Sequence, residues 1–315
     1  MLTRTATAEA TDVEVALPDH LHLYGTHTLS RLVGAPDGPL VVALGGISAN
    51  RFVADAPGSG SGWWQGLVGR GCAIDPARHR VLGLDFAADE SGAAAPSTHD
   101  QAEILAAAIR ACGAGPAILV GASYGGMVAL ALAESRPELV RRLVIIAAPA
   151  APHPMSTAIR ELQRRIVALG IGGGRAEDGL AIARGLAMTT YRTPEEFEAR
   201  FAGGIDEADP LCVSAPGAYL RACGSRYPEI MSPGRFLSLS ASIDRHRVDP
   251  RAIPHPALVI GASSDRLVPP GQSKALADAL PDARLHILDC LYGHDMFLKE
   301  AEALGALIAP FLEAA

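Results

Sequence analysis

The chain has 315 residues, of which 49% are hydrophobic and 19% are charged, and its formal net charge is −7. This composition is typical of a globular protein with a large core, and the acidic balance without a basic block disfavours nucleic acid as a partner. The five cysteines are odd in number and form no C-x-x-C pair. They predict reduced thiols in a cytoplasm, with neither a disulfide framework nor a metal site.

The sequence predicts neither a signal peptide nor a membrane span. Residues 1–12 lack an apolar core, so we expect them to be irregular. Residues 117–133 are uncharged, but Ser-Tyr-Gly-Gly interrupts them and they fall short of the ~20 apolar residues that a span requires. We therefore expect a cytoplasmic protein with no membrane partner.

Short apolar segments alternate with helical patterns along most of the chain. Continuous apolar strands separated by helices indicate an α/β fold, with a mostly parallel sheet covered by helices on both faces. We expect strands at residues 40–44, 80–84, 117–120, 143–147, 257–261 and 284–288, and helices at 99–112, 127–135 and 272–280.

One long region departs from this alternation. Residues 149–248 contain no buried strand pattern, and proline-rich edges mark both ends. Helical patterns occupy residues 160–169, 177–188, 195–201 and 233–243, with a glycine-rich break at 170–174. We therefore predict a core formed by residues 1–148 and 249–315, and a helical lid inserted at 149–248.

Residues 117–126, Ala-Ile-Leu-Val-Gly-Ala-Ser-Tyr-Gly-Gly, place a serine between a predicted strand and a predicted helix. This is the G-x-S-x-G nucleophile elbow in the structural context that it requires. Gly121 and Gly125 flank Ser123 because the turn is too tight for side chains beside it, and the serine backbone is expected to be strained. The N-terminus of the next helix favours negative charge that develops at the site. The pattern predicts Ser123 as a nucleophile.

The C-terminal part of the chain supplies the partners that a serine nucleophile needs. The serine requires a base to accept its proton, and the base requires a carboxylate to fix its tautomer. In this architecture the chain order is serine, acid, histidine, and the loops at the carboxyl ends of the strands build the site. Asp265 and His294 each follow a predicted strand in that order. We therefore predict the triad Ser123, Asp265 and His294.

An oxyanion hole requires two backbone N–H groups directed at the developing charge. One is expected from Tyr124, directly after the nucleophile. The other is expected from the loop after the strand at 40–44, where glycine lets the backbone approach closely. Gly45 and Gly46 are both candidates, and the sequence does not choose between them.

Together these residues resemble the homoserine O-acyltransferase family, an α/β-hydrolase-fold group of methionine biosynthesis. The match extends over roughly residues 35–312. The motifs are Gly62-Trp-Trp-Gln65 with Gly69, Ser-Tyr-Gly-Gly-Met after Gly121, Ala183-Arg184 followed by Tyr191-Arg-Thr193 with Phe197, Arg200 and Phe201, and Tyr292-Gly-His-Asp-Met-Phe-Leu298. The last motif is quite specific, because ordinary hydrolases rarely carry an aspartate directly after the triad histidine.

The resemblance implies an acyl-CoA co-substrate, no bound cofactor, and a homodimer formed through the lid. It also implies that Asp295 holds the amino group of an amino-acid acceptor and Arg184 its carboxylate, with Tyr191 nearby. A zwitterion needs one anion and one cation, and an arginine fork suits a carboxylate. From the residues alone, a solvated lid residue is the favoured interpretation of Arg184, and Asp295 could be a loop cap.

Several departures from the family pattern bear on the acyl group. Ser-Tyr-Gly-Gly replaces the Ser-Met-Gly-Gly usual in acetyl-transferring members, and residues 85–91 replace the family's Gly-Ser-Thr-Gly-Pro loop. These departures resemble the shorter subgroup that transfers succinyl, whose carboxylate would require a cation. Arg51, Arg160 and Arg164 are candidates for that cation.

The resulting expectation is an acyl-CoA:L-homoserine O-acyltransferase, with succinyl favoured over acetyl. Three alternatives remain open. They are an L-serine O-acyltransferase of cysteine synthesis, a carboxylesterase or lactonase on the same triad, and a binding module that kept the fold without catalysis.

Overall fold

A computed structural model describes residues 10–56, 60–113, 115–201 and 214–314. Its centre is an eight-stranded sheet with the strand order β1-β2-β4-β3-β5-β6-β7-β8. β2 is antiparallel to both of its neighbours, and the remaining neighbouring pairs are parallel. The strands are β1 (Ala10–Ala16), β2 (His27–Gly34), β3 (Leu40–Leu44), β4 (Arg80–Leu84), β5 (Ala117–Ala122), β6 (Val140–Ile146), β7 (Ala257–Ala262) and β8 (Ala283–Leu288).

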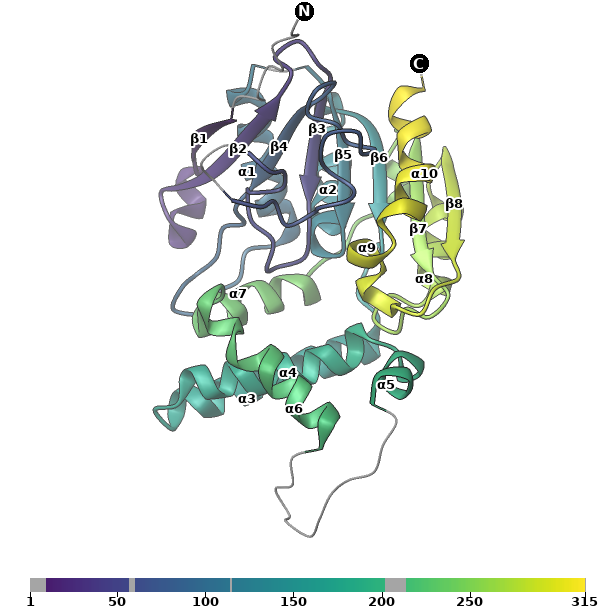
Figure 1. Ribbon diagram of the computed structural model, residues 1–315. Coiled ribbons are helices and arrows are strands. Elements are labelled where there is room, and N and C mark those ends of the chain that lie inside the picture. The colour runs from purple at the N-terminus through teal and green to yellow at the C-terminus, as the bar shows by residue number, and fades with distance from the viewer. Residues whose placement is uncertain (1–9, 57–59, 114, 202–213, 315) are drawn as a thin grey trace, which may run out of the picture.

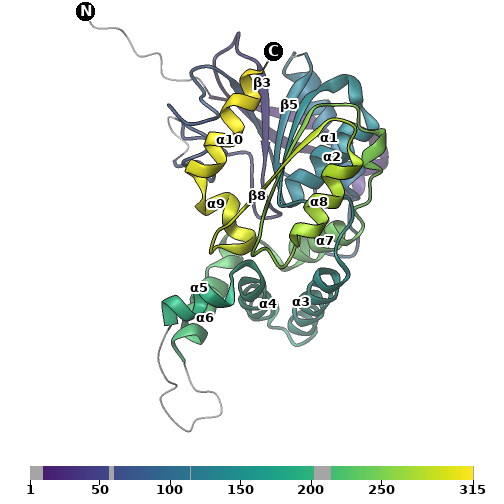
Figure 2. The ribbon, with the colours of Figure 1, turned by 90° about the vertical axis from the view of Figure 1, so that its right-hand side faces the viewer.

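Helices cover both faces of the sheet, as Figures 1 and 2 show. Every residue of β3, β5 and β7 is buried, as expected for parallel strands between two helical layers. One face packs against α1 (Thr98–Ala111), α2 (Tyr124–Ser135) and α8 (Pro270–Ala279). The other packs against α9 (Met296–Lys299) and α10 (Ala301–Glu313).

A group of helices between β6 and β7 forms a further layer at the carboxyl ends of the parallel strands (Figure 1). We refer to residues 149–248 as the insertion. Its two ends are joined by a hydrogen bond of 3.1 Å from the Val248 N–H to the Ala150 carbonyl. Its helices are α3 (Pro154–Gly172), α4 (Ala176–Tyr191), α5 (Pro194–Phe201), α6 (Ala215–Ser225) and α7 (Pro233–Asp244).

Short 3-10 helices connect several of these elements. They are η1 (Asp19–Tyr24), η2 (Pro137–Leu139), η3 (Tyr227–Glu229), η4 (Pro250–Ala252) and η5 (Gly293–Asp295). Among the described residues, no helix is long and apolar enough to cross a membrane. The cysteines that the structure describes are free thiols, and Cys212 lies outside the described residues.

The six predicted strands are present, with ends that differ by no more than three residues from those expected. The expectation of irregular structure for residues 1–12 is wrong at residues 10–12, which begin β1; residues 1–9 lie outside the described residues. The expected break at 170–174 starts late, because α3 continues to Gly172. β1, β2, α6, α9 and α10 have no counterpart in the sequence prediction. β1 is stabilised by pairing with β2 along its whole length, a contact between distant residues that local patterning does not reveal.

Candidate active site

Ser123 lies at the sharp turn between β5 and α2. Its backbone has φ +54° and ψ −120°, a conformation that costs roughly 1–3 kcal/mol for a residue other than glycine. A Cβ atom on Gly121 would lie 2.5 Å from the Gly125 carbonyl oxygen, and one on Gly125 would lie 2.5 Å from the backbone of Leu44. Both positions therefore require glycine, and the surrounding structure holds the serine in a strained, half-buried position.

The three residues predicted as a triad are hydrogen-bonded to one another. His294 Nε2 lies 2.9 Å from Ser123 Oγ, and His294 Nδ1 lies 2.8 Å from Asp265 Oδ2. The other carboxylate oxygen of Asp265 accepts the backbone N–H groups of Leu267 and Val268, at 2.8 and 3.0 Å. Asp265 and His294 are both buried. This arrangement orients the imidazole so that Nε2 can accept the serine proton.

The protonation of His294 reflects two opposed effects. Burial lowers its pKa, but the negative charge and hydrogen bond of Asp265, assisted by the charge of Asp295, outweigh burial. The pKa of His294 therefore lies above its ordinary value. An imidazolium formed by proton transfer from Ser123 would be stabilised in the same way.

The loop after β3 packs directly against the elbow. The Gly125 N–H donates to the Gly45 carbonyl at 2.8 Å, which fixes the loop beside the nucleophile. Within the described part of the chain, the N–H groups of Tyr124, Gly46 and Ile47 have no acceptor. These amides remain available for an oxyanion.

The Tyr124 side chain connects the elbow to the insertion. It is fully buried, its hydroxyl lies 2.6 Å from Ser242 Oγ in α7, and its ring meets that of Phe86 edge-to-face at 4.9 Å. The residue that departs from the usual methionine of the family motif therefore fastens α7 to the core.

Tyr191 lies next to His294, and Arg184 lies over the ring of Tyr191. The Tyr191 ring stacks on the His294 ring, with centroids 5.8 Å apart. The Arg184 guanidinium lies 5.3 Å from the centre of the Tyr191 ring and 4.7 Å from that of Tyr227. Among the described residues, no carboxylate forms an ion pair with Arg184. The half-buried guanidinium therefore presents a cation near the triad, held by two aromatic faces.

Asp295 is buried directly after the triad histidine. Its Oδ2 lies 3.1 Å from Arg192 Nε, close enough for an ion pair but outside hydrogen-bond geometry. Arg192 donates to Glu196 at 2.6 Å. Burial raises the pKa of Asp295, while the charges of Arg192, His294 and Arg184 oppose that rise. No role for Arg192 or Glu196 could be predicted from helical spacing, because Arg192 lies between α4 and α5 and only Glu196 is in α5.

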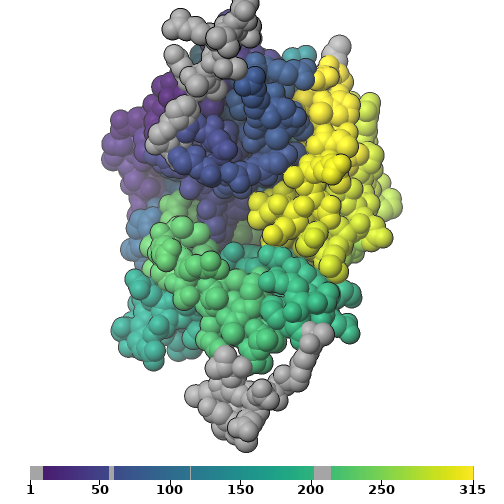
Figure 3. All heavy atoms as spheres, in the orientation of Figure 1, coloured from purple at the N-terminus to yellow at the C-terminus, as the bar shows by residue number. Residues whose placement is uncertain are grey.

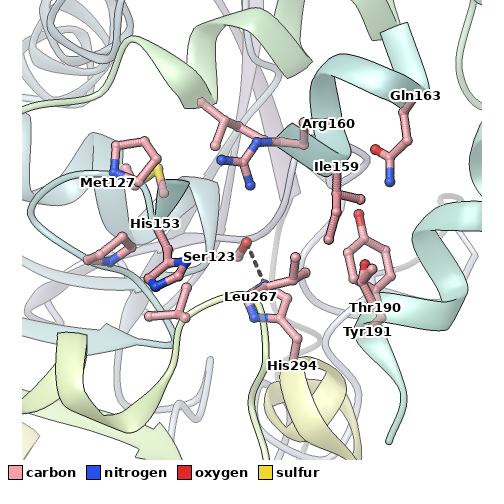
Figure 4. A pocket seen from close by; sticks show the side chains of 14 residues that line it. Ser123, Met127, His153, Ile159, Arg160, Gln163, Thr190, Tyr191, Leu267 and His294 are labelled. Atoms are coloured by element: carbon pink, nitrogen blue, oxygen red, sulfur yellow. Dashed lines mark hydrogen bonds between the residues drawn. The ribbon is translucent and has the colours of Figure 1, made fainter. Parts of the chain in front are cut away.

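A small cavity of about 40 Å³ opens beside Ser123 and His294. Arg160 from α3 lines it, and in Figure 4 its guanidinium extends toward Ser123. Arg160 donates through Nε and Nη2 to Asp244 Oδ1, at 2.8 and 2.6 Å, and Arg164 donates to Asp244 Oδ2 at 2.6 Å. Two cations share one carboxylate, so this cluster retains a positive charge at the edge of the cavity.

The other two candidate arginines have different surroundings. Arg164 also donates to the backbone and side chain of Ser240, at 3.1 Å each, and does not line the cavity. Arg51 lies in a separate groove and donates to Asp85 at 2.6 Å. Of the three arginines, Arg160 therefore lies nearest the reacting groups.

The fold and the hydrogen-bonded serine, histidine and aspartate define a protein of the α/β-hydrolase class. The family model described as "alpha/beta hydrolase fold" matches residues 39–301. A homoserine O-succinyltransferase from Xanthomonas campestris pv. campestris is 40% identical over an alignment of 285 residues that covers 89% of this chain and 77% of that protein. A homoserine O-acetyltransferase from Deinococcus radiodurans is 32% identical over an alignment of 266 residues that covers 79% of this chain and 77% of that protein.

A solved structure shows the same fold at lower identity. The crystal structure of homoserine O-acetyltransferase from Bacillus anthracis aligns with a TM-score of 0.85 at 16% identity, over 98% of this chain and 99% of that one. From the sequence relatives, the chain belongs to the homoserine O-acyltransferase family of the α/β-hydrolase fold.

Proposed function

We propose that this protein transfers an acyl group from acyl-CoA to the hydroxyl of L-homoserine, with succinyl as the preferred acyl group, in methionine biosynthesis. The observation on which the proposal rests is the stack of Arg184, Tyr191 and His294, with Asp295 next in the chain. This stack brings the Arg184 cation close to the base that activates the acceptor, and Asp295 adds an anion directly after that base in the chain. Such a pair suits the carboxylate and ammonium groups of an amino acid.

The reaction follows a ping-pong course. His294 Nε2 accepts the Ser123 proton as Oγ attacks the thioester carbonyl, and the same proton then goes to the departing CoA thiolate. The acyl group remains as an ester on Ser123. The homoserine hydroxyl next gives its proton to His294 and attacks this ester, and His294 returns the proton to Ser123 Oγ as O-acyl-homoserine leaves.

Backbone amides stabilise both tetrahedral intermediates in this mechanism. Tyr124 supplies one N–H, aided by the N-terminus of α2. The second amide comes from the loop after β3, which the hydrogen bond from Gly125 to the Gly45 carbonyl holds beside the elbow, and the N–H groups of Gly46 and Ile47 have no described acceptor. The insertion covers the site as a lid and protects the acyl ester from water.

Arg160 supports succinyl as the acyl group. It lines the cavity beside Ser123, and Asp244 holds its guanidinium through Nε and Nη2, which leaves Nη1 for a ligand. A succinyl ester on Ser123 would place its carboxylate in this cavity. Arg160→Met is expected to lower kcat/KM for succinyl-CoA by roughly 10- to 100-fold, the range for a hydrogen bond to a charged group, and to spare acetyl-CoA. Arg165→Met, an exposed neighbour on α3, is the matched control.

The decisive experiment is a matrix of acetyl-CoA and succinyl-CoA against L-homoserine and L-serine, with products identified by mass. Acyl-homoserine as the main product supports the proposal, whereas acyl-serine would identify the serine enzyme. CoA release that does not increase with added amino acid would favour an esterase or lactonase. Ser123→Ala is expected to abolish CoA release, and near-normal turnover in that variant would refute the mechanism.

Exposed apolar side chains on the insertion support the proposed homodimer. Leu162 and Leu169 on α3 are 53% and 77% exposed, and Ile182 on α4 is 62% exposed. Such side chains are expected at an interface. Sedimentation of the full chain tests whether it forms a dimer. If the double variant Leu162→Glu, Ile182→Glu remains a dimer, the interface lies elsewhere.

A further inference from the structure

A groove of about 700 Å³ lies between the core and the insertion, separate from the cavity beside Ser123. Residues 47–52, after β3, and residues 85–90, after β4, contribute to its walls. The start of β2 and the residues around η3 and α7 complete it. Figure 3 shows the surface hollowed between the insertion and the core loops that face it. Its position at the carboxyl ends of parallel strands is where α/β sheets bind ligands.

Three contacts connect this groove to the reacting centre. Ile47 lines the groove and belongs to the loop proposed to supply the second oxyanion N–H. Phe86, also in the groove wall, packs on the ring of Tyr124, the residue next to the nucleophile. Ser48 Oγ lies 2.8 Å from the hydroxyl of Tyr227, whose ring lies beneath Arg184. The walls of the groove therefore contact both the oxyanion loop and the proposed acceptor residues.

The small cavity at Ser123 cannot hold the whole acyl donor. A volume of about 40 Å³ accommodates only a few water molecules, so the long chain attached to the thioester sulfur must lie elsewhere. That chain, the pantetheine arm, is uncharged and combines amide groups with apolar segments. The groove offers the same mixture, with apolar Phe52, Trp63 and Met231 beside polar Ser48 and Asn50.

The charges of the groove also suit an uncharged ligand. Its two guanidinium groups already have carboxylate partners in the groove, since Arg51 pairs with Asp85 at 2.6 Å and Arg235 with Glu90 at 3.2 Å. This pairing leaves little net positive charge for phosphates. We propose that the groove binds the pantetheine arm of the acyl donor and directs its thioester toward Ser123. The inference rests on the proposed acyl-CoA-dependent function.

Filling the groove tests this proposal. Leu29→Trp and Ile230→Trp add bulk at two exposed positions that line the groove from the core and from the insertion. Each is expected to raise KM for succinyl-CoA and acetyl-CoA by roughly tenfold, a modest fraction of the binding energy of such a ligand. Acylation by p-nitrophenyl acetate, which has no pantetheine arm, should stay unchanged. Ile287→Trp on β8 is the matched control, because Ile287 is 38% exposed and Leu29 is 37% exposed.

Two results would overturn the proposal. If the KM for acyl-CoA of Leu29→Trp and Ile230→Trp equals that of Ile287→Trp, the pantetheine arm lies elsewhere. An equal loss with p-nitrophenyl acetate would show that the groove acts on Ser123 itself and not on the arm. The proposed function fails separately, if the unaltered protein is acylated by p-nitrophenyl acetate but releases no CoA from either thioester.

Discussion

Substituting Asp265 by asparagine tests the proposed triad with little change in shape. Asp265 Oδ1 accepts the N–H groups of Leu267 and Val268, while Oδ2 faces His294 Nδ1. In Asp265→Asn, the two backbone donors require the amide oxygen on their side. The amide NH₂ therefore faces Nδ1, which must then be the unprotonated, accepting nitrogen.

This orientation determines the size of the expected effect. With Nδ1 unprotonated, the neutral imidazole has its proton on Nε2, which then cannot accept the proton of Ser123. Loss of the correct tautomer in such triads lowers kcat by roughly 10⁴-fold, equivalent to about 5.4 kcal/mol of activation free energy. The two backbone hydrogen bonds remain, so the free energy of unfolding should change little.

The assay is CoA release with and without L-homoserine, together with urea denaturation. Asp278→Asn, at an exposed carboxylate on α8 that pairs with Lys274, is the control and should behave like the unaltered protein. An Asp265→Asn variant that keeps kcat within tenfold of the unaltered enzyme would refute the assigned role. So would a loss of activity explained by unfolding alone.

Three further predictions concern pH and packing. Only a neutral imidazole can accept the serine proton, so kcat/KM for the acyl donor should rise with pH. The apparent pKa of this rise should lie above 6.5, the ordinary value for histidine. A rise that is complete below pH 6.5 would contradict the environment described for His294. Burial lowers the pKa of His246 to about 4, so as the pH falls the unfolded state binds a proton on this histidine before the folded state does. The free energy of unfolding, measured by urea denaturation, should therefore fall by about 3 kcal/mol between pH 6.5 and 4. An equal fall in His246→Gln would show that His246 is not the group responsible. In Gly125→Ala the added Cβ would lie 2.5 Å from the Leu44 backbone, which should lower the free energy of unfolding by roughly 1–3 kcal/mol. Gly46→Ala is the control, because no atom lies within 4 Å of a Cβ added there. Equal free energies of unfolding for the two variants would refute the packing argument.

The elbow at Ser123 could be predicted because its sequence signal is local. Strand, tight turn and helix are contiguous in residues 117–135, and the glycines beside Ser123 are required by contacts within that turn and with β3. Asp265 and His294 could be predicted without any contact information, because the chain order of the triad and the ends of the strands can both be predicted from the sequence. The strands β1 and β2 could not be predicted from local sequence patterns, because they are stabilised by pairing with each other and, for β2, with β4.

The sequence by itself determined the fold class and predicted the triad of Ser123, Asp265 and His294, since apolar periodicity and the elbow motif depend on neighbouring residues. Only the tertiary structure decided which groups surround them. It placed Arg160, of the three candidate arginines, in the cavity beside Ser123, paired Asp295 with Arg192, and opened a groove beside the loop after β3. These features depend on how the insertion packs on the core. Contacts between residues far apart in the chain decide that packing, and local sequence patterns do not encode them.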